Sequence, residues 1–540
     1  MLDWPDATLY EALSAVADRR PDGTALRFDE DAVGYDDLRE RSLAFARGLA
    51  DRGIGRGDTV AVWLANRPEW PVSQFAVSYL GANVVAVNTR YRAHELEYML
   101  RDSGAGALVL EESFLDRDYL GTVADLAPTL RTDDPDSFDP DGFPDLHSVV
   151  SVDPAPDYPA VETVADVSAE PPAHPDPVGD NEAPVVIFYT SGTTGDPKGC
   201  VHGSHGVLNH SHNVGSYFGI GDGDIGLGAI PFCGSYGYNV WLSCLAHGVP
   251  LVVQSHFDPE RAVELIDRHG VTYFSATAQM YLRLIEADGF APERVESLRR
   301  GAMFFANGFD EAAFKRIEAA AGFPVVQPYG LSEANTQLFV GDPEAPEEQR
   351  KRVGGPLIHD ALEARVVDPE SREELPAGER GELALRGYNV MQGYLDRPEA
   401  TAEVFDGADW LYTGDLCERD DRGRLYYHSR LDDALRVRGF LVSPGEIESA
   451  IDGYPGVAAA QVVGAPHPRH GQVPVAFVVP AGDHGDLDGD ALLAHLEDRV
   501  ADYKVPEEVV LVDEFPRTEG PHGAKIRKEE LRERVADRYV

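Results

Sequence analysis

Short apolar runs alternate with amphipathic stretches over most of this chain, and few folds accommodate that order. The amphipathic segment YDDLRERSLAFARGLADRG (35–53) precedes the run TVAVWL (59–64), and the segment WPVSQFAVSYLGA (70–82) then leads into the run NVVAVN (83–88). The alternation returns at APVVIFYT (183–190) and continues through VTYFSAT (271–277). Strands that alternate with helices are typical of βαβ units around a parallel sheet, so we predict an α/β fold.

The length of 540 residues is too great for a single hydrophobic core, so we expect more than one domain. We predict a large N-terminal domain over residues 1–429, made of parallel-sheet βαβ subdomains plus a small β-rich part after Gly381. Residues 430–540 mix helical and strand patterns and are expected to form a small α+β domain. Residues 131–182 are rich in Asp, Pro and Ser, and we predict an exposed acidic loop there.

The chain is strongly acidic, because 47 basic and 93 acidic residues give a formal net charge of −46 at pH 7. Such a surface repels phosphate backbones and anionic lipids, which argues against nucleic-acid binding and membrane-surface binding. A generally acidic surface, as in proteins adapted to high salt, is favoured over a specific cationic partner, since counterions at high salt screen the self-repulsion.

Neither a membrane span nor a secretion signal is expected. No apolar run approaches the roughly 20 residues that a spanning helix needs. The N-terminus carries acidic residues early and lacks the basic-then-apolar order of a signal peptide. The four cysteines fit neither a disulfide framework nor a zinc site, as in reduced proteins of the cytosol. We therefore expect a cytoplasmic protein, either a monomer or a homodimer.

Four histidines lie close together in VHGSHGVLNHSHN (201–213). They are His202, His205, His210 and His212. No acidic or thiol side chain stands near them in the sequence, so a metal site there is not favoured.

The segment YTSGTTGDPKG (189–199) combines glycines, hydroxyl side chains and a lysine directly after a predicted buried strand. Glycines let a phosphate approach successive backbone N–H groups closely, and the hydroxyls add donors. Lys198 supplies a positive charge, so the loop suits a polyphosphate. It is not a Walker A loop, because its lysine follows Pro197 and precedes a glycine.

Further segments accompany this loop along the chain. They are VNTRYRAHELEYMLRDSGA (87–105), QPYGLSE (327–333), WLYTGDL (410–416), SRLDDALRVRGFLVSPGEIE (429–448), YKVPEEVVLVDEFPRT (503–518) and GAKIRK (523–528). With the loop, they resemble the signature segments of the adenylate-forming, AMP-binding acyl-CoA synthetase family, and specifically its acid:CoA ligase branch. The resemblance covers essentially the whole chain and implies that the small C-terminal domain is mobile.

The resemblance implies that ATP activates a carboxylic acid as acyl-AMP and that CoA then takes the acyl group, with Mg²⁺ as cofactor. Thr190 and Glu333 would hold the metal, and a hydroxyl with one carboxylate suits Mg²⁺. The catalytic residues would be Lys525, Glu333 and Lys198. The implied ATP-binding residues are Thr190, Ser191, Gly192, Thr193, Thr194, Gly195, Lys198, Gln327, Tyr329, Gly330, Ser332, Asp415, Arg430 and Lys525.

Individual roles follow from the same resemblance. Ser332 would touch the α-phosphate, and Tyr329 would offer a flat ring to adenine with Gln327 nearby. The carboxylate of Asp415 could accept hydrogen bonds from both ribose hydroxyls, with Arg430 as the matching donor on that side.

Lys525 would bridge the acid and the α-phosphate during adenylation. The segment PRTEGPHGAKIRK departs from the family pattern, because its gap is longer and Ala524 stands before the lysine. The frame Lys-Ile-x-Lys favours Lys525 over Lys528 as the catalytic lysine.

The segment 429–448 matches the connection between the two domains. Asp432 would be the hinge about which the small domain rotates between the half-reactions. Gly439 would line the tunnel for CoA, while Arg436 and Arg438 could contact its phosphates or could be solvated arginines.

The acyl pocket departs most from the family. The family's Pro-x-x-His-x-x-Gly reads PFCGSYG (231–237) here, so Gly234 replaces the histidine. We assign Phe232, Gly234, Tyr236 and Gly237 to this pocket, although core packing is the commoner role of aromatic residues. No aspartate stands in the segment to pair with an α-ammonium group, which argues against an amino-acid substrate.

An AMP-forming acid:CoA ligase acting on a fatty or other apolar or aromatic acid is therefore the favoured function. One alternative is a stand-alone adenylation enzyme that loads a carrier protein, and the absence of a carrier segment after GAKIRK disfavours it. Another is a non-catalytic nucleotide-binding homologue. The presence of Lys198, Glu333, Asp415, Arg430 and Lys525 opposes that alternative.

Overall fold

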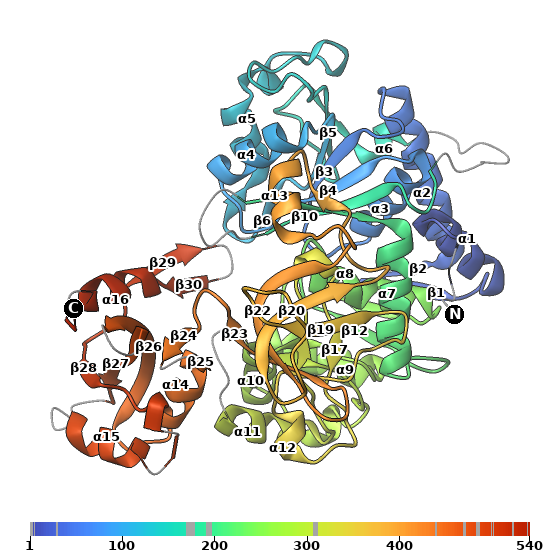
Figure 1. Cartoon of the computed structure of the whole chain (residues 1–540). Coiled ribbons are helices and arrows are strands. Elements are labelled where there is room, and N and C mark those ends of the chain that lie inside the picture. The colour runs from blue at the N-terminus through green and yellow to red at the C-terminus, as the bar shows by residue number, and fades with distance from the viewer. Residues whose placement is uncertain are drawn as a thin grey trace.

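The structure is a computed structural model of the whole chain. It describes all residues except 1–3, 5, 29–30, 169–178, 191–196, 306–310, 438–439, 468–470, 482–486, 498, 501, 521–522, 537 and 540. For residues 440–441, 471, 502, 518–520 and 523–525 it describes the backbone alone. A large N-terminal body and a smaller C-terminal body lie side by side (Figure 1). The predicted α/β fold with a large and a small domain is confirmed.

An eight-stranded sheet forms the centre of the large body. Its strands, in spatial order, are β21 (Gly393–Tyr394), β11 (Gly199–Gly203), β10 (Pro184–Tyr189), β4 (Asn83–Ala86), β3 (Thr59–Trp63), β5 (Ala107–Leu110), β8 (Ser148–Ser151) and β9 (Val161–Thr163). Neighbours from β10 to β9 run parallel, whereas β11 and β21 are antiparallel to the strands beside them.

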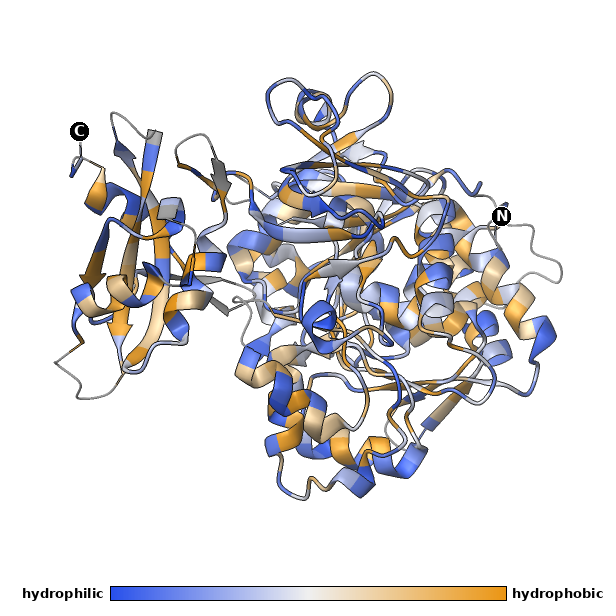
Figure 2. Ribbon diagram, turned by 60° about the horizontal axis from the view of Figure 1, so that its bottom comes forward, coloured by the Kyte–Doolittle hydropathy of each residue, from blue (hydrophilic) through white to orange (hydrophobic). Residues whose placement is uncertain are grey.

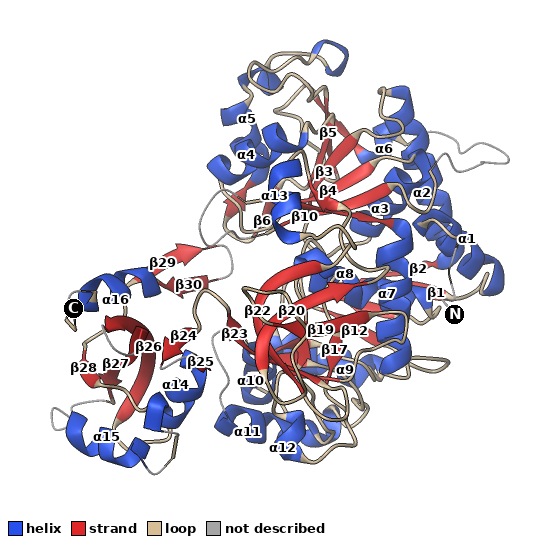
Figure 3. Cartoon of the chain, in the orientation of Figure 1, coloured by secondary structure: helices blue, strands red, loops and turns tan. Residues whose placement is uncertain are grey.

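Helices cover both faces of this sheet (Figure 3). α2 (Tyr35–Asp51) and α3 (Glu69–Leu80) lie on one face, and α4 (Ala93–Ser103) and α5 (Tyr119–Leu126) lie on the other. Val60 and Val62 of β3 pack into the first layer, while Ala61 and Trp63 pack into the second. Alternate side chains of a strand point to opposite faces, so strands buried on both faces read as continuous apolar runs.

The acidic segment 131–182 corrects our prediction of an exposed loop. It contributes β8 and β9, which extend the central sheet in parallel order, and every residue of β8 is buried. Phe138, Phe143 and Leu146 stand among the aspartates and are buried against the α4–α5 layer. These apolar residues attach the segment to the large body, whereas most of its described aspartates, which characterise its composition, belong to its solvent-exposed side.

Two further sheets complete the large body. A four-stranded sheet runs β12 (Gly226–Gly228), β13 (Leu251–Val253), β1 (Thr24–Phe28) and β2 (Asp31–Gly34). A five-stranded antiparallel sheet runs β18 (Gly354–Gly355), β23 (Leu425–Arg430), β22 (Leu411–Arg419), β20 (Arg380–Arg386) and β19 (Glu363–Val367). The helices around them are α1 (Leu9–Arg19), α7 (Ser204–Tyr217), α8 (Ser235–Ala246), α9 (Pro259–His269), α10 (Ala278–Glu286) and α11 (Glu311–Ala321).

Short elements connect these layers. They are β6 (Ser113–Phe114), β7 (Arg117–Asp118), α6 (Val164–Val167), β14 (Ala276–Thr277), β15 (Met303–Phe304), β16 (Pro328–Tyr329), β17 (Phe339–Val340), α12 (Glu347–Arg350) and α13 (Pro398–Val404).

The smaller body has its own hydrophobic cores. Its strands are β24 (Leu435–Val437), β25 (Phe440–Val442), β26 (Val457–His467), β27 (Gly471–Pro480) and β28 (Glu508–Leu511), with a separate hairpin of β29 (Arg517–Gly520) and β30 (Gly523–Ile526). Its helices are α14 (Pro444–Asp452), α15 (Gly489–Glu497) and α16 (Lys528–Val535). The boundary that we predict between residues 429 and 430 falls at the end of β23, in the large body's antiparallel sheet.

Hydropathy follows these layers. The helices carry both hydrophobic and hydrophilic residues, and strands of the smaller body are mostly hydrophobic (Figure 2). Within the described ranges, no helix has both the length and the apolar character needed to cross a membrane.

Candidate active site

The segment predicted to bind phosphate connects strand β10 to strand β11. β10 and β11 pair antiparallel, with Tyr189 opposite Gly199. The backbone N–H of Thr190 donates to the carbonyl of Lys198 at 2.9 Å and closes the base of the loop. Ser191, Gly192, Thr193, Thr194 and Gly195 lie outside the described residues, so their ATP-binding roles stay predictions. The hairpin places Thr190 and Lys198 at neighbouring strand ends.

Helix α4 supports the base of this loop. The hydroxyl of Tyr98 donates to the carbonyl of Pro197 at 2.8 Å, next to Lys198. The hydroxyl of Tyr189 donates to the carboxylate of Asp102 at 2.8 Å, and Arg397 forms an ion pair with the same carboxylate. The segment 87–105, which the family resemblance includes without a role, therefore holds both ends of the loop.

Lys198 and Glu333 meet at one aromatic side chain. The Lys198 ammonium lies 5.1 Å from the centre of the Tyr394 ring, a cation–π contact. The hydroxyl of Tyr394 donates to Glu333 Oε1 at 3.0 Å. Tyr394 reaches this position because β21 pairs with β11, with Cys200 opposite Tyr394. The structure thus brings a predicted catalytic cation and the predicted metal carboxylate to the same place.

Asp415 and Arg430 face each other across β22 and β23. Arg430 Nη1 lies 3.0 Å from Asp415 Oδ1, and the hydroxyl of Tyr329 donates to Asp415 Oδ2 at 2.6 Å. Burial raises the pKa of Asp415 to about 6, against the opposing effect of Arg430. Each oxygen of the Asp415 carboxylate has a second lone pair, so both oxygens can still accept hydrogen bonds from a ligand.

The rings around Tyr329 form a stack. Its ring lies 4.4 Å from that of Phe339 and 5.4 Å from that of Tyr427, and its side chain is buried. Gln327 is fully buried, and its side-chain amide donates to the carbonyl of Lys351. Contact of either residue with adenine stays a prediction, because in this structure each side chain is engaged by the protein itself.

The two candidate lysines of the C-terminal segment differ in their surroundings. Lys528 begins α16, and its ammonium forms an ion pair with Glu448 at 3.1 Å. Lys525 lies in β30 opposite Thr518, and its side chain is outside the described residues. The ion pair neutralises Lys528 inside the smaller body, which favours Lys525 as the mobile charge.

The predicted hinge and CoA residues lie where the chain enters the smaller body. Asp432 stands in a turn directly after β23, and Arg436 in β24 forms an exposed ion pair with Glu370 at 3.3 Å. Arg438 and Gly439 lie outside the described residues. The hinge and CoA roles stay predictions.

The residues assigned to the acyl pocket have different environments. Phe232 is 1% exposed and packs edge-on against Trp70 in an aromatic cluster with Tyr238 and Trp241. The structure therefore corrects our assignment of Phe232 to the acyl pocket, because the side chain lies in the hydrophobic core. A Cβ on Gly237 would lie 2.1 Å from the carbonyl oxygen of Pro231, so this glycine permits close packing.

Gly234 and Tyr236 remain candidates for the pocket wall. Gly234 is exposed at the start of α8, and a Cβ there would lie 3.7 Å from the carbonyl oxygen of Pro231, an ordinary van der Waals contact, so the position has room for a side chain. The Tyr236 ring is partly exposed and lies 4.9 Å from that of Phe304, edge to face.

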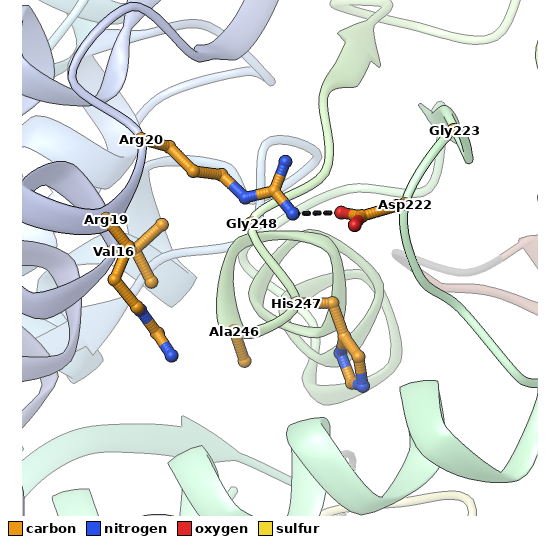
Figure 4. A pocket seen from close by; sticks show the side chains of 8 residues that line it. All are labelled: Val16, Arg19, Arg20, Asp222, Gly223, Ala246, His247 and Gly248. Carbon is orange, nitrogen blue, oxygen red and sulfur yellow. Dashed lines mark hydrogen bonds and ion pairs between the residues drawn. The ribbon is translucent and has the colours of Figure 1, made fainter.

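One cavity of the large body lies away from the predicted site residues. This cavity of about 520 Å³ lies between α1 and the end of α8. An ion pair from Arg20 to Asp222 joins two of the residues that line it (Figure 4). None of the predicted site residues lines it. Arg20 lies over Gly248, where a side chain would clash with its guanidinium, so this arginine packs against the end of α8.

Several residues of the site are absent from the predicted set. Tyr394 sits in a strand-rich segment whose pattern does not distinguish it, and Tyr98 lies in a motif that carries no role by itself. Among the clustered histidines, His202 and His210 contact the segment that contains Glu333.

Comparison with known proteins identifies the family. A family model described as AMP-binding enzyme matches residues 13–395, and one described as AMP-binding enzyme C-terminal domain matches residues 446–520. The chain belongs to this family. A feruloyl-CoA synthase from an Amycolatopsis species is 34% identical over 520 residues, which cover 95% of this chain and 96% of the relative.

Solved structures of AMP-binding enzymes agree with the fold. The chain is similar to ATP-bound MatB from Rhodopseudomonas palustris, with a TM-score of 0.81, 26% identity, and coverage of 98% of this chain and 100% of that one. It is also similar to o-succinylbenzoate coenzyme A synthetase from Bacillus subtilis in complex with ATP and a magnesium ion. That comparison has a TM-score of 0.75, 27% identity, and coverage of 98% and 99%. This AMP-binding enzyme is an AMP-forming acyl-CoA ligase.

Proposed function

We propose that this ligase activates a fatty, aromatic or other apolar carboxylic acid, first as acyl-AMP and then as acyl-CoA. The observation that carries the proposal is the meeting of Lys198 and Glu333 at Tyr394, beside the hairpin that begins at Thr190. Lys198 at the end of the predicted phosphate loop, Glu333 and Tyr394 come together there from three separate parts of the chain. This set suits a nucleotide triphosphate that binds with a metal.

In the first step, a carboxylate oxygen of the acid attacks the α-phosphorus of ATP, and the bond to pyrophosphate breaks. Both reactants are anions, so the site must offset the negative charge that develops in the transition state. Lys198 and the loop N–H groups would hold the leaving pyrophosphate. Lys525 would bridge the acid and the α-phosphate, which Ser332 would also contact.

Thr190 and Glu333 would hold Mg²⁺, which supplies positive charge to the phosphates when bound. Within the described ranges, no group of three His, Cys, Asp or Glu side chains could hold a metal alone. A hydroxyl and one carboxylate fit Mg²⁺, because this ion keeps several waters and takes phosphate oxygens as ligands. Glu333 is half-buried and binds Tyr394 through Oε1, so Oε2 can face a cation.

Asp415 would bind the ribose. Its carboxylate is oriented by Tyr329 and Arg430, so it is fixed before the nucleotide arrives. Pre-oriented acceptors lose little conformational entropy on binding.

In the second step, the thiol of CoA loses its proton and attacks the acyl carbon, and the bond to AMP breaks. We propose that the smaller body moves about Asp432 between the steps, which removes Lys525 and presents Gly439 to the CoA arm. Arg436 would then exchange Glu370 for a CoA phosphate, since its present ion pair is exposed and therefore weak.

The acid would lie beside Gly234, which is exposed and carries no side chain, against the rings of Tyr236 and Phe304. Two aromatic rings at this position favour an apolar or aromatic acyl group.

The decisive experiment measures AMP from a panel of carboxylic acids, with and without CoA, at low and at multimolar KCl. We expect multiple turnovers only with CoA, and preference for fatty or aromatic acids over amino acids. AMP turnover that never depends on CoA would overturn the ligase proposal, and acyl-AMP formation limited to one turnover with or without CoA would indicate carrier-protein loading. Absence of ATP consumption with every acid at both salt levels would indicate a non-catalytic homologue.

A further inference from the structure

The backbone directly after Glu333 is strained. Asn335, Thr336 and Gln337 have φ angles of 55°, 57° and 41°, three consecutive left-handed residues without a glycine. Thr336 is β-branched, for which this conformation is a true outlier. Such residues are energetically unfavourable and persist only where surrounding contacts hold them.

Side chains and backbone from three other elements hold this turn by its carbonyl groups. The bonds are His202 Nε2 to Ser332 O at 2.7 Å, Met391 N to Glu333 O at 2.8 Å, Asn389 Nδ2 to Ala334 O at 2.7 Å, and His210 Nε2 to Thr336 O at 2.6 Å. The two histidines bind the carbonyl groups of Ser332 and Thr336 at the two ends of the turn, and Glu333 lies between these residues in the chain.

Both histidines are neutral and have a defined tautomer. A carbonyl oxygen can only accept, so Nε2 carries the proton in each ring. His202 is 1% exposed and His210 is fully buried, and this burial lowers each pKa to about 4. The Nε2–H groups of both histidines therefore remain hydrogen-bond donors throughout the neutral pH range. Their scaffolds are β11, which follows the phosphate loop, and α7, which lies beside α8.

The turn cannot relax toward the strand before it. A Cβ on Gly330 would lie 2.3 Å from the backbone nitrogen of Gln337 and 2.5 Å from Cα of Thr336. The turn thus packs directly on Gly330, and the histidines hold it there. Contacts on opposite sides fix the direction in which Glu333 leaves the backbone.

We propose that His202 and His210 are positioning residues that hold the strained turn so that the Glu333 carboxylate meets Tyr394 and Lys198. This inference rests on the proposed role of Glu333 in holding Mg²⁺ with ATP. The histidines that the sequence shows as a cluster thus support the metal carboxylate through the backbone and are not metal ligands themselves.

The test compares His210→Leu, His210→Gln and His212→Leu. Leu removes the donor, while Gln retains an N–H donor near the position of Nε2. His212 is the matched control, because it lies on the same helix and stacks instead on His247, with ring centres 4.4 Å apart. Each protein is assayed for acyl-AMP formation against Mg²⁺ and MgATP, and for thioester formation from supplied acyl-AMP.

We expect His210→Leu to raise the Mg²⁺ midpoint and the KM for MgATP by about 10-fold or more, the scale for losing a group that orients a metal ligand. Thioester formation from acyl-AMP should stay near wild type, since that step needs no MgATP. His210→Gln should recover most of the loss, and His212→Leu should match wild type.

A wild-type Mg²⁺ midpoint in His210→Leu, or equal loss in both half-reactions, would overturn the inference. Should His210→Leu not fold, as judged by circular dichroism, Asn389→Asp deletes another donor to the same turn with almost no change of shape. It must then show the same split between half-reactions, and failure to do so overturns the inference equally. Failure of the proposed function is distinct, because then wild type itself forms no acyl-AMP.

Discussion

At the residue scale, Lys528 is engaged in an ion pair, which favours Lys525 as the catalytic lysine. Lys528 is paired with Glu448, whose side chain is 16% exposed, inside the smaller body. Lys525 is in the hairpin strand β30, which belongs to no larger sheet. A charge that must move between two positions cannot also serve as a permanent ion-pair partner.

Replacing Lys525 by Ala should slow acyl-AMP formation by about 10²–10³-fold, the usual effect of losing one electrostatic donor to a transition state. Thioester formation from supplied acyl-AMP should be spared. Pyrophosphate exchange and a CoA-dependent assay measure the two steps separately, and Lys528→Ala is the control with the same change of charge. Equal loss of both steps in the Lys525 variant would contradict the assignment.

At the element scale, β11 and α7 each place one neutral histidine against the turn that contains Glu333. The pKa of each is about 4 in the folded protein and about 6.5 when unfolded. The unfolded chain therefore binds more protons between these values. The stability contributed by neutral burial is complete above pH 6.5 and is lost as the pH falls toward 4.

In wild type, unfolding between pH 6.5 and pH 4 is accompanied by proton binding at His202 and at His210. In His210→Gln, the proton bound at position 210 is no longer taken up. The free energy of unfolding should then fall less steeply with decreasing pH than in wild type, by about one proton, or about 1.4 kcal/mol per pH unit. Urea unfolding of the large body at intervals from pH 7.5 to pH 5 measures the difference. The raised pKa of Asp415 acts in the opposite direction but is common to both proteins. Parallel pH curves for the two proteins would show that His210 does not titrate as an isolated buried group.

At the scale of the whole molecule, an ion-pair network joins the two bodies. Arg380 of β20 and Lys504 of the smaller body both bind Glu446 of α14, and His428 of β23 lies 3.7 Å from the same carboxylate. Burial acts to raise the pKa of Glu446, but the two cations outweigh it and hold the pKa at about 2. A rotation of the smaller body that carries α14 away from β20 would break the contact between Glu446 and Arg380.

Arg380→Gln removes the contact between Arg380 and Glu446 and should therefore destabilise the present arrangement of the two bodies. The ratio of the two half-reaction rates should change several-fold, because a loss of about 1.4 kcal/mol would correspond to a factor of ten. Arg386→Gln is the matched control. Arg386 lies on the same strand but pairs with Glu363 across an exposed part of the sheet inside the large body. A shift in the ratio only for Arg380→Gln supports the network as a link between arrangements, whereas an unchanged ratio excludes it.

The sequence by itself determined several of the elements and the kind of chemistry. Continuous apolar runs made β3, β4 and β10 predictable, because strands buried on both faces need such runs. The spacing of glycines, hydroxyls and Lys198 indicated a phosphate loop, and the segments around Glu333, Asp415 and Lys525 indicated which family uses it.

Only the tertiary structure decided which side chains meet. The aspartate-rich composition of 131–182 hid the strands β8 and β9, because a few apolar residues such as Phe143 decide burial against a polar average. Phe232 is part of the core, and His210 supports Thr336, for reasons that no local pattern contains. Local periodicity records which face of an element is buried. The partner on that face comes from a distant segment, so the contact of Lys198 and Glu333 with Tyr394 exists only once the strands have paired.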